Sequence, residues 1–497
     1  MVPCYQRLEK MQVMSSQWKS KKIAHWALLP VLSIMLMNLG CATVGPDYAS
    51  PNLSAPEAWH AELEGGLRAK PVDPETLGHW WSVLNDPVLS SLISQAVVGN
   101  LDLKVARARV RQARANRRIN QANWFPTMDA VGSFRKSRSS ENSGSGTETD
   151  LSAVGFDAVW ELDIFGGTRR SVEAATADLQ AISEDLHDVL VTLLAEVALN
   201  YVEARTFQVR LAVAEQNLRA QQETYQLTSW RSQAGLTTDL AVQQAKYNLE
   251  STRSQIPTLR TGLEGAMNRI AVLLGRHPGA LHKILEEPRP IPAARMEVTV
   301  GVPADTLRHR PDVRRAERQL AAQTARVGVA VAELYPKLTL LGSIGVESLT
   351  VSDLFVPGSR TYSFGPSISW PIFNAGAIRS NIEAQSALQE QALGEYEGTV
   401  LSALEEVENA LVAYVQEQNR RQALAESAQA AKIAVQLAET QFEAGLIDFN
   451  NVLDAQRSLL TFQDQLAESQ GTVTSNLIRL YKALGGGWTS LARAATQ

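Results

Sequence analysis

The chain contains an internal duplication. The segment WELDIFGGTR at residues 160–169 returns in altered form as WPIFNAGAIR at residues 370–379, an offset of 210 residues. The same offset relates Asp102 to Asp312, Pro126 to Pro336, Gly166 to Gly376, Gly235 to Gly445, and Gly275 to Gly485. Because the offset never drifts, neither copy contains an insertion relative to the other. Residues 100–275 and 310–485 are therefore predicted to form two structurally equivalent repeats.

Strand-like alternation follows the first helix of each repeat. That helix ends at Phe125-Pro126 or Tyr335-Pro336, because proline does not continue a helix. Apolar Tyr362, Phe364, Ile368, Trp370 and Ile372 alternate with Ser363, Gly365, Ser367 and Ser369. Exposed loops are expected at residues 137–150 and 347–360. The pattern predicts two β-hairpins, and therefore four strands per chain.

Four such strands fit either a soluble sandwich or a membrane location. A sheet exposed to lipid must close on itself, and the smallest barrels that do so have about eight strands. Four strands cannot close alone, so a membrane location predicts that several chains share one barrel. Trp160 and Trp370 would then lie at the membrane interface, where indole rings are favoured.

Very long helices follow the strands. Residues 168–234 contain neither Gly nor Pro, and as one helix they would extend about 100 Å. Alternating steps of three and four predict a coiled-coil seam at Leu190, Leu194, Val197, Tyr201, Ala204, Gln208, Leu211, Glu215, Leu218, Gln222 and Tyr225. In the second copy, Gly394 and Gly398 predict a bend. A return helix is expected after Gly235 and after Gly445, which gives two helical hairpins per chain.

The N-terminus has the pattern of an export signal. Lysines precede an apolar run at residues 24–39, which is shorter than the roughly 20 residues of a spanning helix. The run ends in a small residue followed by Cys41, which resembles the lipobox of bacterial lipoproteins, with Asn38 where those proteins usually have Leu. We therefore predict acylation of Cys41. The alternative is a buried cysteine in a hydrophobic helix.

A row of basic residues is the one feature that suggests nucleic acid. Lys104, Arg107, Arg111, Arg114 and Arg118 share one helix face. The alternative, a solvated or salt-bridged face, is preferred because the segment follows an export signal and the net charge is only −5. No nucleic-acid partner is predicted.

Several motifs resemble the TolC-type outer membrane factors, and most closely the NodT-type lipoproteins of tripartite RND efflux systems. They are CATVGPDY (residues 41–48), GVPADTLRHRPDVRRAE (301–317), WPIFNAGAIR (370–379) and FEAGLIDFNNVLDAQR (442–457). The resemblance covers nearly the whole chain after the signal. It implies a mainly α fold with a transmembrane β part. In the homotrimer, a twelve-stranded outer-membrane β-barrel would continue into a periplasmic α-helical barrel.

These inferences divide the chain into six segments. They are a signal peptide at 1–40, a lipidated wrapping segment at 41–99 with a short helix near 88–98, repeat 1 at 100–275, a proline-rich linker at 276–309, repeat 2 at 310–485, and a tail at 486–497. The resemblance places the wrapping segment and the linker in an equatorial region around the helices.

Motifs for catalysis and cofactors are missing from the sequence. Gly166-Gly167 lacks the Lys-Ser/Thr of a phosphate loop, and the seven histidines are scattered without HExxH spacing or a Cys partner. No nucleophile motif is present. We therefore predict no enzyme, no cofactor and no metal site.

Three functions fit the sequence. The preferred one is a passive outer-membrane duct of a Gram-negative bacterium, lipid-anchored and extending into the periplasm, which takes drugs or other small molecules from an inner-membrane RND pump. A periplasmic membrane-fusion adaptor would join the two, so contact with the pump would be indirect or weak. The alternatives are a type I protein-secretion channel and a non-conducting coiled-coil envelope lipoprotein.

The helical-hairpin tips are the predicted sites of adaptor contact, because glycine accepts positive φ and lets a partner backbone approach. They comprise Gly235, Leu236 and Thr237, and Gly445, Leu446 and Ile447. The alternative is that these glycines only cap helices.

The resemblance also implies a periplasmic gate just beyond the second tip, at Asp454 with Asn450 and Asn451. Three like charges at a narrow pore would repel one another and bind cations. Asn451 replaces the second Asp that some relatives carry, which weakens such a ring. Alternatively, Asp454 stabilises the first turn of a helix through the macrodipole.

Overall fold

The computed structural model describes residues 43–52, 55–70, 73–293 and 298–489. The predicted signal peptide and Cys41 lie outside this part of the chain, as does most of the tail. The described chain forms two compact units. The first contains residues 43–48, Asn116–Thr176 and Ala321–Glu390, and the second contains Ala49–Ala115, Ala177–Leu320 and residues 391–489.

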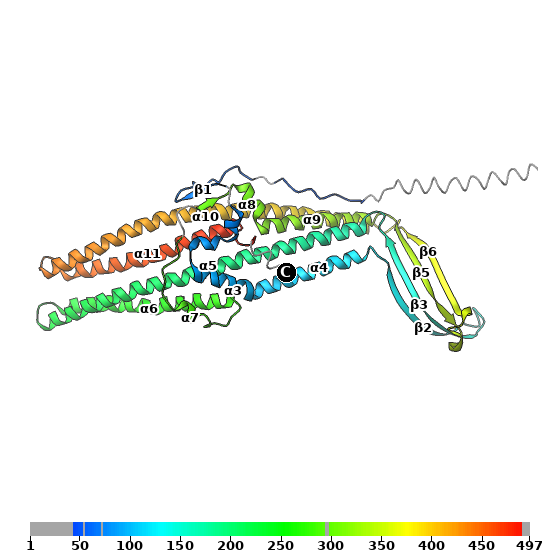
Figure 1. The fold of residues 1–497 in the computed structure, drawn as a ribbon, viewed down its shortest axis with the longest axis horizontal. Helices are drawn as coiled ribbons and strands as arrows, with labels where there is room; N and C mark the ends of the chain where they lie inside the picture. Colours follow the sequence, from blue (N-terminus) through cyan, green and yellow to red (C-terminus); the bar gives the residue numbers. More distant parts are fainter. Residues whose placement is uncertain (1–42, 53–54, 71–72, 294–297, 490–497) are drawn as a thin grey trace, which may run out of the picture. The chain divides into compact units, whose positions relative to one another are not determined.

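A four-stranded antiparallel sheet characterises the first unit. Its strands, β2 (Thr127–Arg138), β3 (Glu148–Leu162), β5 (Lys337–Ser348) and β6 (Arg360–Ser369), lie side by side in the order β2-β3-β5-β6 (Figure 1). The two hairpins have the same register, because Thr127 pairs with Val159 and Lys337 pairs with Ser369, 210 residues later. The predicted four strands and the duplication are confirmed.

The strands extend further into the loops than the sequence predicted. Arg138 and Glu148 fall inside the expected loop 137–150, yet they pair across the first hairpin. Lys136 lies 3.5 Å from Glu148 and 3.6 Å from Asp150, so opposite charges favour pairing at this end. In the second loop, the short 3-10 helices η2 (Val351–Asp353) and η3 (Pro357–Ser359) replace the irregular segment that was expected.

The sheet has one mainly apolar face. The register places Met128, Phe156, Ile344 and Tyr362 on the side of the sheet that also carries Phe364 and Ile368. All six of these side chains are exposed. β2 and β6 are the edge strands, and each pairs with one neighbour in the described chain. The sheet therefore presents both an apolar face and two free backbone edges.

Three pairs of equivalent helices complete the repeats. Their bounds are α4 (Leu101–Ala122) and α9 (Pro311–Ala332), α5 (Gly167–Gln233) and α10 (Ala377–Glu443), and α6 (Asp239–Leu273) and α11 (Phe449–Ala483). The predicted helical hairpins are confirmed, with 67 residues in each long helix and 35 in each return helix. α10 is continuous helix through Gly394 and Gly398. Within the described residues, no helix combines the length and the apolarity needed to cross a membrane.

The predicted seam of α5 is correct only in part. Leu190, Leu194, Val197 and Tyr201 are almost fully buried. Nearer the tip, however, the buried residues are Ala214, Asn217, Gln221 and Thr228, whereas the predicted Gln222 is exposed. The reason is that α5 has two neighbours here: Ala214 packs with α6, and the Asn217 amide donates to Gln463 of α11 at 2.9 Å. A helix between two partners buries a wider face than a two-stranded coil does.

The N-terminal segment supplies part of the main core of the second unit. It forms β1 (Leu67–Ala69), α2 (Pro74–Gly78), η1 (Trp80–Leu84) and α3 (Pro87–Gly99). Trp80 is 1% exposed and stacks on Tyr481 of α11. The short helix expected near residues 88–98 is therefore present as α3.

The linker takes a larger part in this core than the sequence suggested. It forms α7 (His282–Leu285), β4 (Val298–Val300) and α8 (Pro303–His309), and β4 pairs in parallel with β1. Leu281, Leu285 and Val300 are buried in the main hydrophobic cluster. The linker is therefore also part of this core, because a proline-rich chain can still bury its apolar side chains against helices.

The predicted basic face of α4 is mainly solvated, in line with the preferred interpretation, because Lys104, Arg111, Arg114 and Arg118 are exposed. The equivalent helix of the other repeat carries the ion pairs. In the second repeat, Arg315 of α9 contacts Asp185 at 2.8 Å and Asp188 at 3.0 Å, and Arg314 contacts Glu184 at 2.6 Å. In the first repeat, Arg107 donates to the carbonyl of Val97. These arginines join α9 to α5 and α4 to α3.

Candidate functional site

Both helical-hairpin tips end in the same glycine cap. Gly235 and Gly445 have φ values of 71° and 68°, which L side chains rarely adopt. In each case the next residue donates back to the helix, from Leu236 N to the Arg231 carbonyl and from Leu446 N to the Gln441 carbonyl. Both glycines therefore cap their helices, and adaptor contact at the tips stays a prediction. Open space surrounds the position of a side chain at each glycine, so these caps also leave room for a partner.

The tips expose apolar side chains. Leu236 is 69% exposed and Leu446 is 74% exposed, whereas Thr237 and Ile447 are half-buried. Arg231, at the end of α5, lies over the Phe442 ring at the end of α10, 4.7 Å from its centroid. This contact joins the two hairpins close to their tips, and the sequence did not suggest it.

The three predicted gate residues lie on the exposed side of α11. Asn450, Asn451 and Asp454 are all exposed, and the Asn451 amide donates to the carbonyl of Asp448. Asp454 is the sixth residue of α11, which begins at Phe449. The macrodipole acts mainly within the first turn, so this position does not favour the helix-stabilising alternative. The carboxylate instead lies 3.3 Å from Arg457.

Arg457 connects the two repeats, and the sequence patterns did not identify it as a site residue. It donates to the Tyr247 hydroxyl and to the Asn248 side-chain oxygen of α6, both at 3.0 Å. Tyr247 and Arg457 occupy equivalent positions in the two repeats, because they are 210 residues apart. The offset was therefore a signal that could have identified this pair. Arg457 joins Asp454 to the other helical hairpin.

A polar cavity of about 480 Å³ adjoins this contact, between α5, α6 and α11. Arg210 and Asp464 line it and form a bidentate ion pair, with N–O distances of 2.8 and 2.9 Å. Hydrogen bonding to Asp464 raises the pKa of Arg210 above its usual value, so the guanidinium is charged at neutral pH. Gln456 of α11 donates to Thr224 of α5 at 3.1 Å. Polar contacts thus hold the second hairpin to the first along this region.

Trp160 and Trp370 are anchored in the same way. The Trp160 indole N–H donates to the Trp124 carbonyl at 3.1 Å, and that of Trp370 donates to the Leu334 carbonyl at 3.0 Å. Each acceptor lies in the turn before the first strand of its repeat. The hydrogen bonds fix the indole rings at the helix-proximal end of the sheet, where the strands meet the helices.

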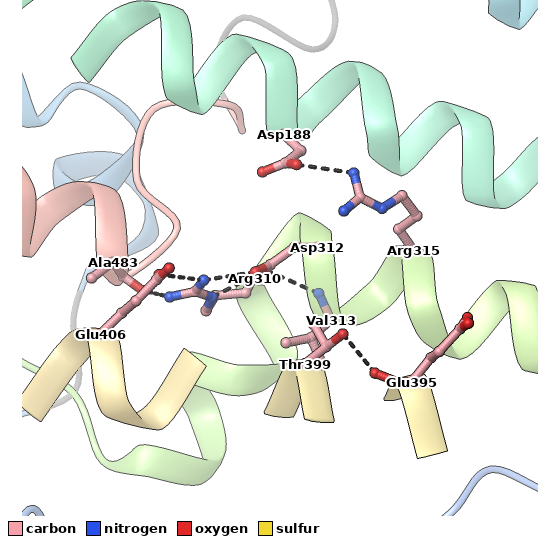
Figure 2. Close-up of polar contacts among 9 residues, drawn as sticks. All are labelled: Asp188, Arg310, Asp312, Val313, Arg315, Glu395, Thr399, Glu406 and Ala483. Atoms are coloured by element: carbon pink, nitrogen blue, oxygen red, sulfur yellow. Dashed lines mark hydrogen bonds and ion pairs between the residues drawn. The ribbon is translucent and has the colours of Figure 1, made fainter. Parts of the chain in front are cut away.

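The linker motif at residues 301–317 forms a charged junction, shown in Figure 2. Arg310 donates to the carbonyl of Ala483 at the end of α11 (2.7 Å), and it pairs with Asp312 (2.6 Å) and with Glu406 of α10 (2.7 Å). Its side chain is only 7% exposed. Burial opposes its charge, but the two carboxylates outweigh burial and raise the pKa of Arg310.

The first repeat contains the same connection in an uncharged form. The Asn100 amide donates to the carbonyl of Leu273 at the end of α6 (2.9 Å), and its oxygen accepts from Leu103 N (2.8 Å). Asn100 and Arg310 are equivalent positions, as are Leu273 and Ala483. Each repeat therefore fastens the start of its first helix to the end of its last helix.

The site contains no arrangement that indicates catalysis or metal binding. Among the described residues, no group of three His, Cys, Asp or Glu side chains could hold a metal ion. The polar side chains at the tips, in the cavity and around Arg310 instead join one helix to another. Such contacts can hold or release helices, and they offer no reacting centre.

Comparisons with known proteins agree with this architecture. The family model described as outer membrane efflux protein matches residues 92–276 and 302–486, which correspond to the two repeats. Nodulation protein T of Rhizobium leguminosarum bv. trifolii is 34% identical over 467 residues, covering 94% of this chain and 98% of the relative. The toluene efflux pump outer membrane protein TtgC of Pseudomonas putida is 31% identical, covering 94% of this chain and 97% of the relative.

A solved structure has the same fold. The outer-membrane channel OprN matches with a TM-score of 0.85 and 36% identity, over 90% of this chain and 100% of that one. The fold is accordingly mainly helical, with two β-hairpins in a duplicated unit of strands and long helices. The chain belongs to the family of outer membrane efflux proteins, which are channels and not enzymes.

Proposed function

We propose that this protein is the outer-membrane exit duct of a tripartite RND-type efflux pump. It passively conducts drugs or other small molecules from the periplasm to the exterior. The observation that carries the proposal is the duplicated unit itself, in which an exposed antiparallel hairpin continues into a helical hairpin of 67 and 35 residues. Relatives named as toluene efflux pump outer membrane proteins support the class of cargo.

The active form is a homotrimer. Four strands with two free edges cannot satisfy their backbone groups in lipid, whereas twelve strands from three copies close a barrel. The helical hairpins extend into the periplasm, and Trp160 and Trp370 lie at the membrane interface. Residues 41–99 and 276–309 form the equatorial region. The tips, with exposed Leu236 and Leu446, receive the periplasmic adaptor, through which the inner-membrane pump is joined indirectly.

The acyl group on Cys41 is an auxiliary anchor in the outer membrane. Lipidation adds membrane affinity, but a closed barrel already holds the protein in place. Replacing Cys41 with serine should abolish incorporation of labelled fatty acid while export continues. Retention of the label in this variant would contradict the assignment.

Asp454 forms the acidic ring of a gate near the tips. Three copies would gather three carboxylates, whose repulsion is relieved by bound cations. Asp454→Ala should therefore abolish block of the channel by divalent cations added on the tip side, measured in planar bilayers. Trimer stability should hardly change, because the side chain is 71% exposed. Unaltered block together with a less stable helix would support the macrodipole alternative.

Gene deletion tests the efflux role against the closest alternative. Cells without this chain should accumulate a small fluorescent pump substrate, and expression of the chain should restore its expulsion. A type I secretion channel would instead show the loss of a secreted polypeptide from the medium, with unchanged accumulation of the dye.

A further inference from the structure

The two free edges of the sheet carry complementary side chains at their loop ends. β2 and β5 are repeat equivalents, and so are β3 and β6. Where β5 has Val346 and Ser348, the edge strand β2 has Lys136 and Arg138; where β3 has Ser152 and Val154, the edge strand β6 has Tyr362 and Phe364. The free edge of β2 thus carries cations, and the free edge of β6 carries aromatic rings.

The repeat predicts how these edges meet. Inside one chain, β3 pairs with β5 so that Ser152 faces Ser348 and Val154 faces Val346. In the proposed twelve-stranded barrel, β6 of one copy pairs antiparallel with β2 of the next copy. We propose that this junction takes the equivalent register and is specified by cation–aromatic pairs. Shifted by the offset of 210, the register sets Tyr362 opposite Arg138 and Phe364 opposite Lys136 of that next copy. Two cation–aromatic pairs then specify the subunit junction. This inference rests on the proposed trimeric duct.

The identical register of the two hairpins supports this transfer. Thr127 pairs with Val159 in the first hairpin, and Lys337 with Ser369 in the second. Both hairpins therefore present their strands to a neighbour in the same way. A ring of hairpins in which every junction repeats the β3–β5 pairing uses both free edges and leaves none unpaired.

The side chains are suitably placed for the contact. Tyr362 is 76% exposed and Phe364 is 73% exposed, and their rings lie 6.0 Å apart. Residues directly opposite across an antiparallel pair bring their Cβ atoms to about 4.5–5.5 Å. Within its own chain, Lys136 pairs with Asp150 of β3, whose carboxylate balances the lysine charge. On the side away from β3, a ring from the next copy can cover the same ammonium group.

The same arrangement disfavours incorrect pairing. If two β2 edges met, Lys136 and Arg138 of both copies would come together, and like charges opposite one another are destabilising. If two β6 edges met, neither Lys136 nor Arg138 would face the rings. Only the junction of β6 with β2 satisfies both edges, and because it is directional it can repeat from copy to copy around a ring.

Paired cysteines on the other face of the sheet test the register. The proposal sets Ser363 opposite Ser137, and Ser367 opposite Ser133, of the next copy. Oxidation of S363C/S137C and of S367C/S133C in outer membranes should link protomers into covalent dimers and trimers. The matched controls S363C/S133C and S367C/S137C use the same four positions four residues out of register, about 13 Å apart, and should not cross-link. The natural cysteines are only Cys4 and Cys41, and single-cysteine variants report any background from them.

The outcomes separate this inference from the proposed function. Cross-linking of the mismatched pairs would overturn the register while leaving the trimer intact. A trimer by mass in which no pair cross-links would overturn the edge pairing. A monomer by mass would overturn the proposed trimer itself.

A second measurement tests the cation–aromatic pairs. Lys136→Met and Phe364→Leu should each accelerate dissociation of the trimer in detergent by about 2- to 5-fold, and the double variant should be no faster than the stronger single variant. Lys104→Met, which removes an exposed lysine from α4, should leave the rate unchanged. Additive effects of the two substitutions would mean that the side chains do not contact each other across the junction.

Discussion

Arg310→Ala should lower the free energy of unfolding by about 3–5 kcal/mol. The substitution leaves the Ala483 carbonyl without its donor, and it leaves Asp312 and Glu406 without their cation. Because Arg310 is almost fully buried, water cannot readily replace these contacts. Urea unfolding of the detergent-solubilised protein, followed by tryptophan fluorescence, measures the loss.

Two matched variants isolate the cause. Arg308→Ala removes an exposed arginine whose contact with Asp305 is at 4.0 Å, and it should cost less than about 0.5 kcal/mol. Arg310→Asn should recover part of the loss, because the equivalent Asn100 already donates to the end of α6. If Arg310→Asn were as unstable as Arg310→Ala, the bond to Ala483 would contribute nothing.

Arg457→Ala should shift the proposed gate toward the open state. The substitution removes the hydrogen bonds from α11 to Tyr247 and Asn248 of α6, and it frees Asp454 from its cation. If these bonds stabilise the closed state by about 1–2 kcal/mol per protomer, their loss raises the ratio of open to closed channels about 5- to 30-fold for each protomer that carries the substitution. Single-channel recording in planar bilayers measures this ratio as the fraction of time spent open.

Arg253→Ala provides the control for that experiment. Arg253, on α6, is also an exposed arginine, but its ion pair is with Glu250 on the same helix. Its replacement should leave the open fraction unchanged. An equal effect of the two substitutions would show that the loss of positive charge, and not the connection between α6 and α11, controls the opening.

The sequence predicted most of the fold because the duplication constrains it twice. A fixed offset of 210 residues identified equivalent strands and helices, and glycines 235 and 445 marked the helix ends where the structure has its caps. The periodicity of one helix could not identify its neighbours. The buried face of α5 near the tip was therefore predicted incorrectly, because contacts with α6 and α11 bury Asn217 and Gln221.

Local sequence patterns also could not predict the contacts between distant segments. A resemblance identified Asp454, yet its partner Arg457 and the acceptors on α6 depend on how two hairpins pack. Arg310 appeared only as part of a motif. Its role became visible when the structure brought it to the end of α11. Comparison of equivalent positions would have suggested only the contact of Arg457 with Tyr247, which lie 210 residues apart.

The central claim is that the trimer conducts. Single-channel recording of the purified, lipidated protein in a planar bilayer tests it most directly. We expect discrete current steps that divalent cations block from the tip side in the unaltered protein. A trimer that inserts but passes no current, both unaltered and as Arg457→Ala, would contradict the account and favour a non-conducting envelope lipoprotein.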